Sequence, residues 1–163
     1  FGWDNKVLIE KAINAREIEC SVTGNSVTAQ NQNDDDVTAY IPGEIAPNAL
    51  FYDYDAKYND PNGANLLIPA NLGENDLEKI RKTACAAYKA LDVTGLARVD
   101  FFIDKDTNAV YLNEVNTMPG FTPISMFPKM CESAGLHFTE LLELLIQEGF
   151  SRYEAKSRLS TQR

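Results

Sequence analysis

Histidine, cysteine and tryptophan are scarce in this sequence, and their scarcity excludes several kinds of site. The 163 residues include one histidine, three cysteines and one tryptophan. A single histidine, His137, excludes metal sites built from several histidines and argues against a Ser-His or Cys-His nucleophile; we expect it to begin a helix as a surface group. Cys20, Cys85 and Cys131 are odd in number, widely spaced and form no C-x-x-C motif. This pattern predicts three reduced core thiols and a cytoplasmic protein.

Long apolar runs and excess positive charge are also lacking. Although 44% of the residues are hydrophobic, no run approaches the roughly 20 residues of a membrane-spanning helix. The net charge is −9, which opposes nucleic acid as the main partner because its phosphates are bound by Lys and Arg. No G-x-x-x-x-G-K-[ST] motif or other glycine-rich phosphate loop occurs. We therefore expect one domain without a membrane or nucleic-acid partner.

The most informative stretch lies between residues 98 and 126. Residues 98–103 (RVDFFI) and 111–116 (YLNEVN) are rich in apolar and aromatic side chains, as strands are. Residues 104–108 (DKDTN) between them are typical of a turn. The stretch therefore predicts an antiparallel hairpin with its turn centred near Asp106 or Thr107.

Alternation along the hairpin gathers polar groups on one face. Arg98, Asp100 and Phe102 share a face of the first strand, and Glu114 and Asn116 share a face of the second. Asp100 then lies opposite Glu114, where Cβ atoms are ~4.5–5.5 Å apart and like charges repel. Oxygen ligands of this kind favour Mg²⁺ or Mn²⁺ over Zn²⁺. The alternative is a solvated face, but a polar cluster in the most apolar hairpin of the chain favours a cation site.

A calcium-binding loop is a rival interpretation of the same region. The sequence from Asp104 to Asn108 opens like a helix-loop-helix calcium motif. That motif needs Gly at its sixth position and Glu at its twelfth. Here these positions hold Ala109 and Val115, and Glu114 falls one residue short. We reject the calcium loop.

Short apolar runs separated by turn residues predict a mainly antiparallel sheet. Residues 16–22 (REIECSV) alternate strictly, which predicts a half-buried strand with Ile18, Cys20 and Val22 facing the core. The aromatic and charged segment 51–63 has no regular period, which indicates a functional or disordered loop. Further strands are expected at 6–13, 27–29, 39–45 and 66–69.

The sequence also predicts three helices and, overall, an α+β domain. Apolar residues recur at helical spacing in the first, after a capping box of Asn75 and Glu78. The second should end at Gly135, and the third should bury Leu142 with neighbouring leucines and end at Gly149. The helices are expected at 76–91, 128–134 and 138–147, in a domain over 1–150 followed by a polar tail or frayed helix at 151–163.

Five short motifs occur in order along the chain: LIEK at 8–11, DYDAKY at 53–58, ARVD at 97–100, LNEVNTMPG at 112–120 and SM at 125–126. Together they resemble the D-alanine–D-alanine ligases of the ATP-grasp superfamily. They occur in the family's order, cover nearly the whole chain and fade after about Glu148. They match the carboxyl-terminal half of such a ligase, and the chain begins with Phe1, so we expect a fragment with the fold of the ATP-grasp carboxyl-terminal domain.

The resemblance implies a ligase that makes D-alanyl-D-alanine for peptidoglycan. ATP would phosphorylate the carboxylate of one D-alanine, and the amine of a second would attack the acyl phosphate. The implied cofactors are ATP and two Mg²⁺ or Mn²⁺ ions. The implied partners are D-alanine, the amino-terminal half of the ligase and a second copy in a homodimer. That half carries the phosphate-binding lysine and the groups for the first D-alanine, so we expect this chain alone to be inactive.

The resemblance also implies nucleotide and metal ligands. Glu17 would hold the ribose hydroxyls and Phe102 would line the adenine pocket; the alternatives are an exposed strand residue and a core residue. Asp100 and Glu114 would bind one metal ion, and Glu114 and Asn116 a second. The adenine would be bordered by Glu10, Lys11 and the backbone of Ala12 and Ile13.

Catalytic roles follow from the same resemblance. Arg98 and the backbone N–H of Gly120 would stabilise the oxyanion of the tetrahedral intermediate. Ser125 would hold the carboxylate of the second D-alanine, although serine is also a favoured helix N-cap. Lys57 and Tyr58 would lie on a loop that closes over the phosphates; the alternative for Tyr58 is an ordinary loop aromatic.

Related functions are the competing hypotheses: D-alanine–D-lactate ligase, D-alanine–D-serine ligase, or a non-catalytic nucleotide-binding module. Tyr58 and Met126 favour D-alanine, because an apolar Met126 beside the second substrate suits a methyl group and offers no hydrogen bond to a hydroxyl. The joint presence of Asp100 and Glu114 with the other motif residues argues against a degenerate module.

Overall fold

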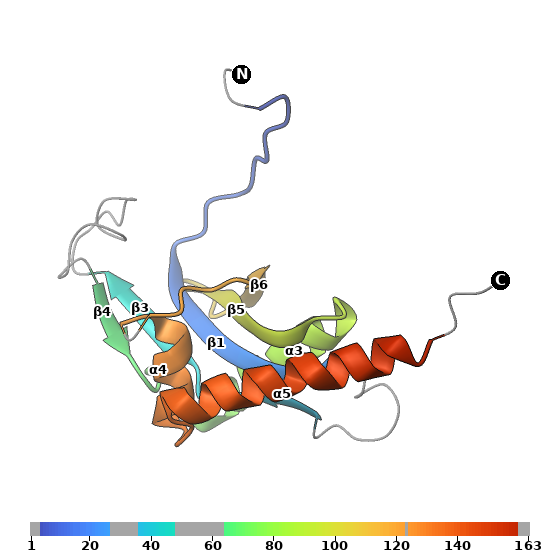
Figure 1. Ribbon diagram of the computed structural model, residues 1–163. Coiled ribbons are helices and arrows are strands. Elements are labelled where there is room, and N and C mark those ends of the chain that lie inside the picture. The colour runs from blue at the N-terminus through green and yellow to red at the C-terminus, as the bar shows by residue number, and fades with distance from the viewer. Residues whose placement is uncertain (1–3, 27–35, 48–63, 123, 160–163) are drawn as a thin grey trace.

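The protein is an antiparallel sheet with helices on both faces (Figure 1). The computed structural model describes residues 4–26, 36–47, 64–122 and 124–159. The fold confirms the predicted α+β class. In chain order the elements are β1 (Ala15–Asn25), β2 (Val37–Ala39), β3 (Gly43–Pro47), β4 (Ala64–Leu67), α3 (Glu74–Ala90), β5 (Thr94–Asp104), β6 (Val110–Asn116), α4 (Met126–Ser133) and α5 (Phe138–Ser157).

The sheet is built around β1 and β5, which pair along all eleven residues of each strand. The strand order is β4-β3-β1-β5-β6, and β2 also pairs with β1. The strand expected at 39–45 is two strands, β2 and β3, with Pro42 between them. Proline has no N–H to donate to a strand ladder, so the run breaks there. The strand expected at 27–29 lies outside the described residues.

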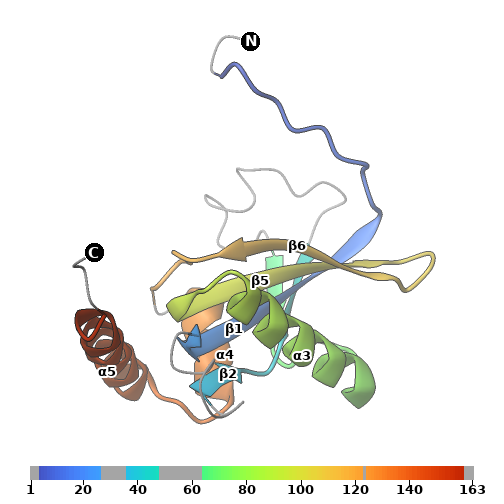
Figure 2. The ribbon, with the colours of Figure 1, turned by 90° about the vertical axis from the view of Figure 1, so that its right-hand side faces the viewer.

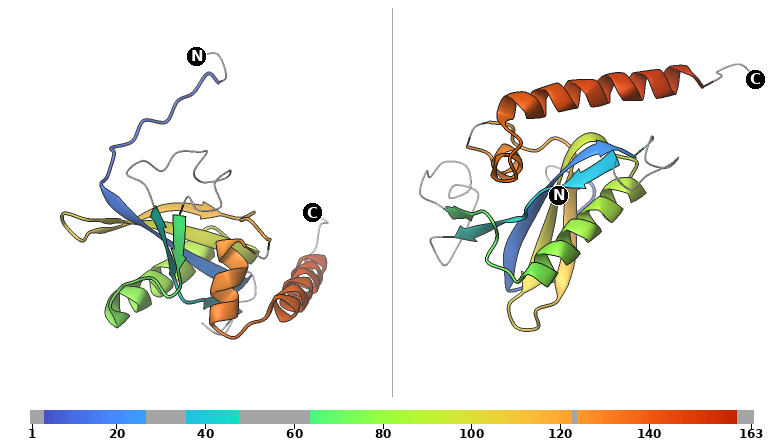
Figure 3. Two further views of the ribbon diagram at one scale, coloured as in Figure 1. Left: turned by 90° about the vertical axis from the view of Figure 1, so that its left-hand side faces the viewer. Right: turned by 90° about the horizontal axis from the view of Figure 1, so that it is seen from below.

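Helices cover the two faces of the sheet unequally. The helix α3 packs on one face, and α4 and α5 lie on the other (Figures 2 and 3). The α3 face holds the larger apolar core, which includes Ile18, Ile80, Tyr88 and Phe101. A smaller core around Phe127 joins α4 and α5 to the other face. No helix in the described part of the chain is long and apolar enough to cross a membrane.

The strand β1 is buried on both faces, so the expectation of a half-buried strand is wrong. Ser21, on the face predicted to be solvated, is fully buried. Its hydroxyl donates to the carbonyl of Phe127 at 3.0 Å, because α4 packs directly over this part of β1. The alternating pattern therefore belongs to a central strand whose polar face is also covered by other elements.

The segment expected as a strand at 6–13 has no regular secondary structure. Residues 4–14 project away from the sheet (Figures 1 and 3). Leu8 is 81% and Ile9 88% exposed. An apolar run predicts a strand only where a neighbouring strand can pair with it, and the described residues supply none here.

The helices begin and end partly as predicted. The helix α3 starts after Gly73 without a side-chain cap, so the capping box of Asn75 and Glu78 is wrong. The helix α4 is followed by Gly135 at φ +90°, as expected. The helix α5 runs through Gly149 to Ser157 and exposes 41% of Leu142, so both expectations for it are wrong. Glycine lowers helix propensity without forcing a stop.

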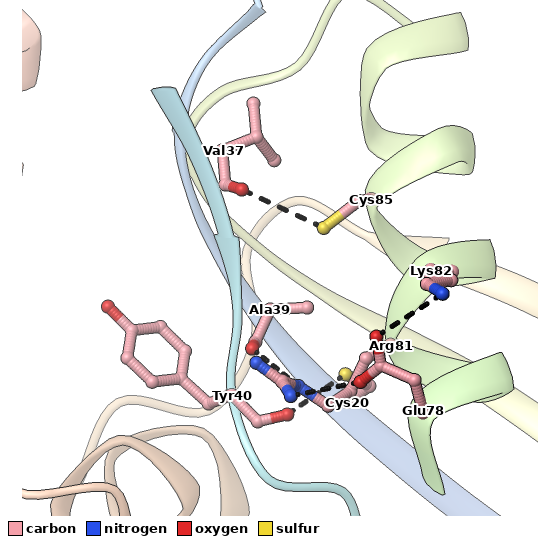
Figure 4. Close-up of polar contacts among 8 residues, drawn as sticks. All are labelled: Cys20, Val37, Ala39, Tyr40, Glu78, Arg81, Lys82 and Cys85. Atoms are coloured by element: carbon pink, nitrogen blue, oxygen red, sulfur yellow. Dashed lines mark hydrogen bonds and ion pairs between the residues drawn. The ribbon is translucent and has the colours of Figure 1, made fainter. Parts of the chain in front are cut away.

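Side chains of α3 cover the open edge of β2 (Figure 4). The Nε–H of Arg81 donates to the carbonyl of Ala39 at 3.0 Å, and the thiol of Cys85 lies 3.8 Å from the carbonyl of Val37. A cavity of about 560 Å³ lies between β2 and α3, and Arg81 also pairs with Glu78 at 3.2 Å. These contacts protect an edge strand that would otherwise be open to pairing.

The three cysteines are free thiols, as predicted. Cys20 and Cys131 are buried and Cys85 is half-buried. Burial raises the pKa of Cys131 to about 12, and it also raises the pKa of Cys20. A thiol whose pKa is raised forms little thiolate, so both behave as inert core residues.

Replacing Gly149 by alanine should stabilise the protein by roughly 0.5–1 kcal/mol, the difference in helix propensity. The site for the new methyl group is open, with no heavy atom within 4 Å. Urea unfolding followed by circular dichroism measures the change. The matched control is Gly135→Ala, which should destabilise the protein because the backbone there has φ +90°. A loss of stability in Gly149→Ala would contradict the continuous helix.

Candidate functional site

Three neighbouring strands align polar side chains in rows on the face opposite α3. In one row Asp100 pairs with Glu19 on β1 and with Glu114 on β6. In the next row Arg98 pairs with Asn116. The predicted hairpin and the predicted opposition of Asp100 and Glu114 are both confirmed. Among the described residues, α4 and α5 cover this face nearer the other end of β1.

A β-bulge lies beside these rows. The register of β5 and β6 shifts between Asp100 and Phe101, which leaves Asn113 as an extra residue on β6. The turn is held by Asp104, whose carboxylate accepts the backbone N–H groups of Asp106 and Thr107 at 2.8 and 3.0 Å. The turn lies where the sequence predicts it. The bulge keeps Glu114 and Asn116 on the face of Arg98.

Arg98 is clamped between two carboxylates. Its Nε and Nη2 groups each donate to Asp100 at 2.7 Å, and its Nε lies 3.3 Å from an oxygen of Glu19. The three side chains are 15%, 12% and 5% exposed. Sequence reasoning missed Glu19, because its position depends on the pairing of β1 with β5, and local alternation assigned it to solvent.

The pKa of Asp100 reports the electrostatic balance of the row. Burial raises this pKa, the hydrogen bond and charge of Arg98 lower it, and the nearby Glu114 raises it again, so that the net shift is upward. The pKa of Arg98 is also raised: burial lowers it, but its hydrogen bond to Asp100 and the surrounding carboxylates outweigh burial. One guanidinium therefore does not fully compensate the carboxylates, and the row favours an additional cation.

The donor set fits a hard cation. Asp100 and Glu114 offer carboxylate oxygens, and Asn116 offers an amide oxygen that also accepts the N–H of Met118 at 3.0 Å. Among the described residues, no three His, Cys, Asp or Glu side chains converge as ligands. The available set is two carboxylates and one amide, all oxygen, which suits Mg²⁺ or Mn²⁺ completed by water or phosphate oxygens.

A cavity of about 130 Å³ adjoins the row. It brings together four of the residues that the sequence singled out: Glu17, Asp100, Phe102 and Glu114. Glu17 and Phe102 are half-buried, so neither is simply an exposed strand residue or a closed core residue. The cavity is lined by Glu17, Ile18, Glu19, Asp100, Phe101, Phe102, Asn113 and Glu114.

Gly120 and Ser125 lie next to each other. A Cβ atom on Gly120 would lie 3.0 Å from the hydroxyl oxygen of Ser125. That oxygen accepts the N–H of Thr122 at 3.1 Å, and although Ser125 is the N-cap of α4, its side chain makes no capping bond. Met126 is 6% exposed and packs with Ile45 in the core. Its contact with a second substrate, and the preference for D-alanine that rests on it, stay predictions.

Other predicted residues are not brought to this cavity. Glu10, Lys11 and Ala12 are exposed and Ile13 is half-buried, in the segment that leaves the sheet. They do not line the cavity of Glu17, so their adenine contacts stay a prediction. Lys57 and Tyr58 lie outside the described residues.

Solved structures define the class of the fold. The D-alanine–D-alanine ligase of Coxiella burnetii superposes with a TM-score of 0.73 and 36% identity, over 91% of this chain and 36% of that chain. The VanG D-Ala:D-Ser ligase of Enterococcus faecalis has a TM-score of 0.67 and 33% identity, over 84% of this chain and 37% of that chain. The antiparallel sheet with flanking helices is the ATP-grasp fold of these ligases.

Sequence comparison gives the family within this class. Residues 1–147 match the family described as D-ala D-ala ligase C-terminus. The D-alanine–D-alanine ligase of Treponema denticola is 58% identical over 161 residues, which is 99% of this chain and 41% of that protein. The chain belongs to the family of D-alanine–D-alanine ligase carboxyl-terminal domains, and it spans about two fifths of the length of this relative.

The raised pKa of Asp100 predicts a pH-dependent stability difference. Because the folded state holds this proton more tightly than the ordinary pKa of 3.8, the associated stability is present at low pH and is lost as the pH rises through the raised value. Asp100→Asn cannot titrate at this position and therefore does not lose this stability. In the absence of divalent metal, the free energy of unfolding of Asp100→Asn minus that of wild type should increase between about pH 3 and about pH 7.

Denaturant unfolding at several pH values measures this difference. Asp106→Asn, in the exposed hairpin turn, is the control and should follow the wild type at every pH. A constant difference between Asp100→Asn and wild type would contradict the raised pKa.

Proposed function

We propose that this chain is the carboxyl-terminal part of an ATP-dependent D-alanine–D-alanine ligase, which forms D-alanyl-D-alanine for peptidoglycan through an acyl phosphate. The observation that supports the proposal is the row of Arg98, Asp100 and Glu114 beside a cavity that Glu17 and Phe102 also line. This arrangement occurs in a chain 58% identical to a protein named as that ligase.

Asp100, Glu114 and Asn116 are the proposed ligands of two Mg²⁺ or Mn²⁺ ions, with Glu114 shared between them. Such ions neutralise phosphate charge and align a phosphoryl group with its acceptor. The opposition of Asp100 and Glu114 and the upward shift in the pKa of Asp100 support this assignment. Without a cation the two carboxylates repel each other, so binding of a metal ion between them is electrostatically favourable.

The cavity is the proposed place of the nucleoside. Glu17 can accept hydrogen bonds from ribose hydroxyls, since an ionised carboxylate offers only acceptors. Phe102, half-buried at the same cavity, offers an apolar surface for the base. Residues 10–13 would complete the adenine site from the projecting segment.

Arg98 and Gly120 are the proposed stabilisers of the oxyanion. Arg98 carries a permanent charge and is fixed by two carboxylates, so it needs little reorganisation as negative charge develops. Gly120 has no side chain to obstruct an approaching substrate. Ser125, adjacent to it, would hold the carboxylate of the second D-alanine. Lys57 and Tyr58 would cover the phosphates and exclude water, which would otherwise hydrolyse an acyl phosphate.

D-alanine is the proposed second substrate because the relative named for it is 58% identical, whereas the D-Ala:D-Ser ligase is 33% identical. The proposed partners are the amino-terminal part of a ligase and a second copy of the protein. The residues for the first D-alanine would come from that amino-terminal part.

The first test is D-alanine-dependent phosphate release with ATP and Mg²⁺. The chain alone should be silent. A chimera in which this chain replaces the matching 161 residues of the Treponema denticola ligase should release phosphate and form the dipeptide. The intact Treponema ligase is the positive control. A folded chimera that stays silent while this control is active would contradict the proposed function.

The second test is Glu114→Gln in the same chimera. Loss of the shared ligand should lower D-alanine-dependent turnover by about 100-fold or more, and it should abolish any rise in melting temperature caused by Mg²⁺. The matched control is Glu154→Gln on the exposed side of α5, where the side chain is 67% exposed; it should behave as wild type. Unchanged turnover in Glu114→Gln would refute the metal assignment.

A further inference from the structure

Glu19 is a buried carboxylate at the site without a role in the scheme above. It is 4% exposed, lies in register with Asp100 on the neighbouring strand and lines the cavity. Its oxygen is 3.3 Å from the Nε of Arg98. The guanidinium is therefore held by carboxylates from two different strands.

The two contacts of Arg98 are unequal. Asp100 uses both of its oxygens on Arg98, each at 2.7 Å, and the same oxygens are the proposed ligands of a metal ion. A divalent cation at Asp100 repels the guanidinium at short range. If Asp100 were the only anion beside Arg98, metal binding would weaken the contact that fixes the guanidinium. Glu19 offers a second anion that does not lie opposite Glu114.

We propose that Glu19 is a positioning residue: it holds Arg98 at the reacting end of the site when the carboxylate of Asp100 binds a metal ion. This inference rests on the proposed function. It also explains why the row carries a third carboxylate. With all three carboxylates ionised, these carboxylates and the guanidinium of Arg98 sum to two negative charges. The first of the two proposed divalent cations balances them without displacing Arg98.

A merely structural pair elsewhere in the sheet supplies the matched control. Glu44 binds Arg16 through two hydrogen bonds of 2.7 and 2.6 Å, and Glu44 is 7% exposed. Its register partner is Ile18, which belongs to the core on the α3 side. Loss of either glutamate charge leaves a half-buried arginine with fewer partners, but of the two glutamates only Glu19 adjoins the proposed site.

The test compares Glu19→Gln, Glu19→Asp and Glu44→Gln in the chimera. Gln keeps the size of the side chain without the charge. Asp keeps the charge, but it is one methylene shorter than Glu, so its carboxylate lies farther from Arg98 than the present 3.3 Å. Both Glu19 variants should lower kcat about 10-fold with the KM for ATP little changed, the size of effect seen for supporting residues around metal sites. Glu44→Gln should lose stability and keep kcat. Wild-type kcat in Glu19→Asp would overturn positioning, because charge alone would then suffice.

Two measurements do not depend on turnover. Binding of Mn²⁺, followed by electron paramagnetic resonance, should weaken about 10-fold in both Glu19 variants and stay unchanged in Glu44→Gln. In the wild type, the Nε–H resonance of Arg98, assigned through Arg98→Lys, should stay protected from solvent exchange when Mg²⁺ is added. Loss of that protection would overturn the proposal even where a variant fails to fold.

The outcomes separate this inference from the ligase proposal. A wild-type chimera that ligates, with Glu19 variants equal to it in kcat and Mn²⁺ affinity, would overturn the role of Glu19 alone. A silent wild-type chimera that binds Mn²⁺ with the expected dependence on Glu19 would contradict the ligase function and support the positioning of Arg98.

Discussion

The pairing of β1 with β5 is the interaction on which the rest of the structure depends. It brings residues 69 to 89 positions apart into register along eleven pairs, and it gives the central strands two different faces. One face is apolar and closed by α3. In the described part of the chain, α4 and α5 close the other face at one end, and polar side chains of β1, β5 and β6 lie in rows toward the other end.

Electrostatic tension at this polar end is the main energetic feature of the site. Burial of Asp100 and its nearness to Glu114 work against ionisation, and Arg98 only partly offsets them. A fold selected for stability alone would replace such a cluster by apolar residues, since buried ion pairs are often no better than packed hydrophobic ones. Its presence is the kind of local conflict expected where a sequence is selected for function.

Sequence reasoning succeeded where the structure is local. The hairpin of β5 and β6 has a short turn, so alternation alone placed Asp100 opposite Glu114. Glu19 required the long-range pairing of β1, which no local pattern reveals. The apolar run at 6–13 and the helix through Gly149 failed for a related reason, because tertiary surroundings decide whether an apolar run becomes a strand and whether a glycine ends a helix. The burial of Met126 likewise depends on β3, far away in the sequence.

The bulge at Asn113 has a consequence for how the hairpin can vary. It absorbs one residue between the turn and the site, so the strands have one register beside the turn and another beside Glu114. A one-residue deletion from β6 between the turn and Glu114 can therefore be taken up by loss of the bulge, without moving Glu114 or Asn116 to the wrong face. The positions of Glu114 and Asn116 can therefore be inherited by hairpins of two lengths, with and without the extra residue.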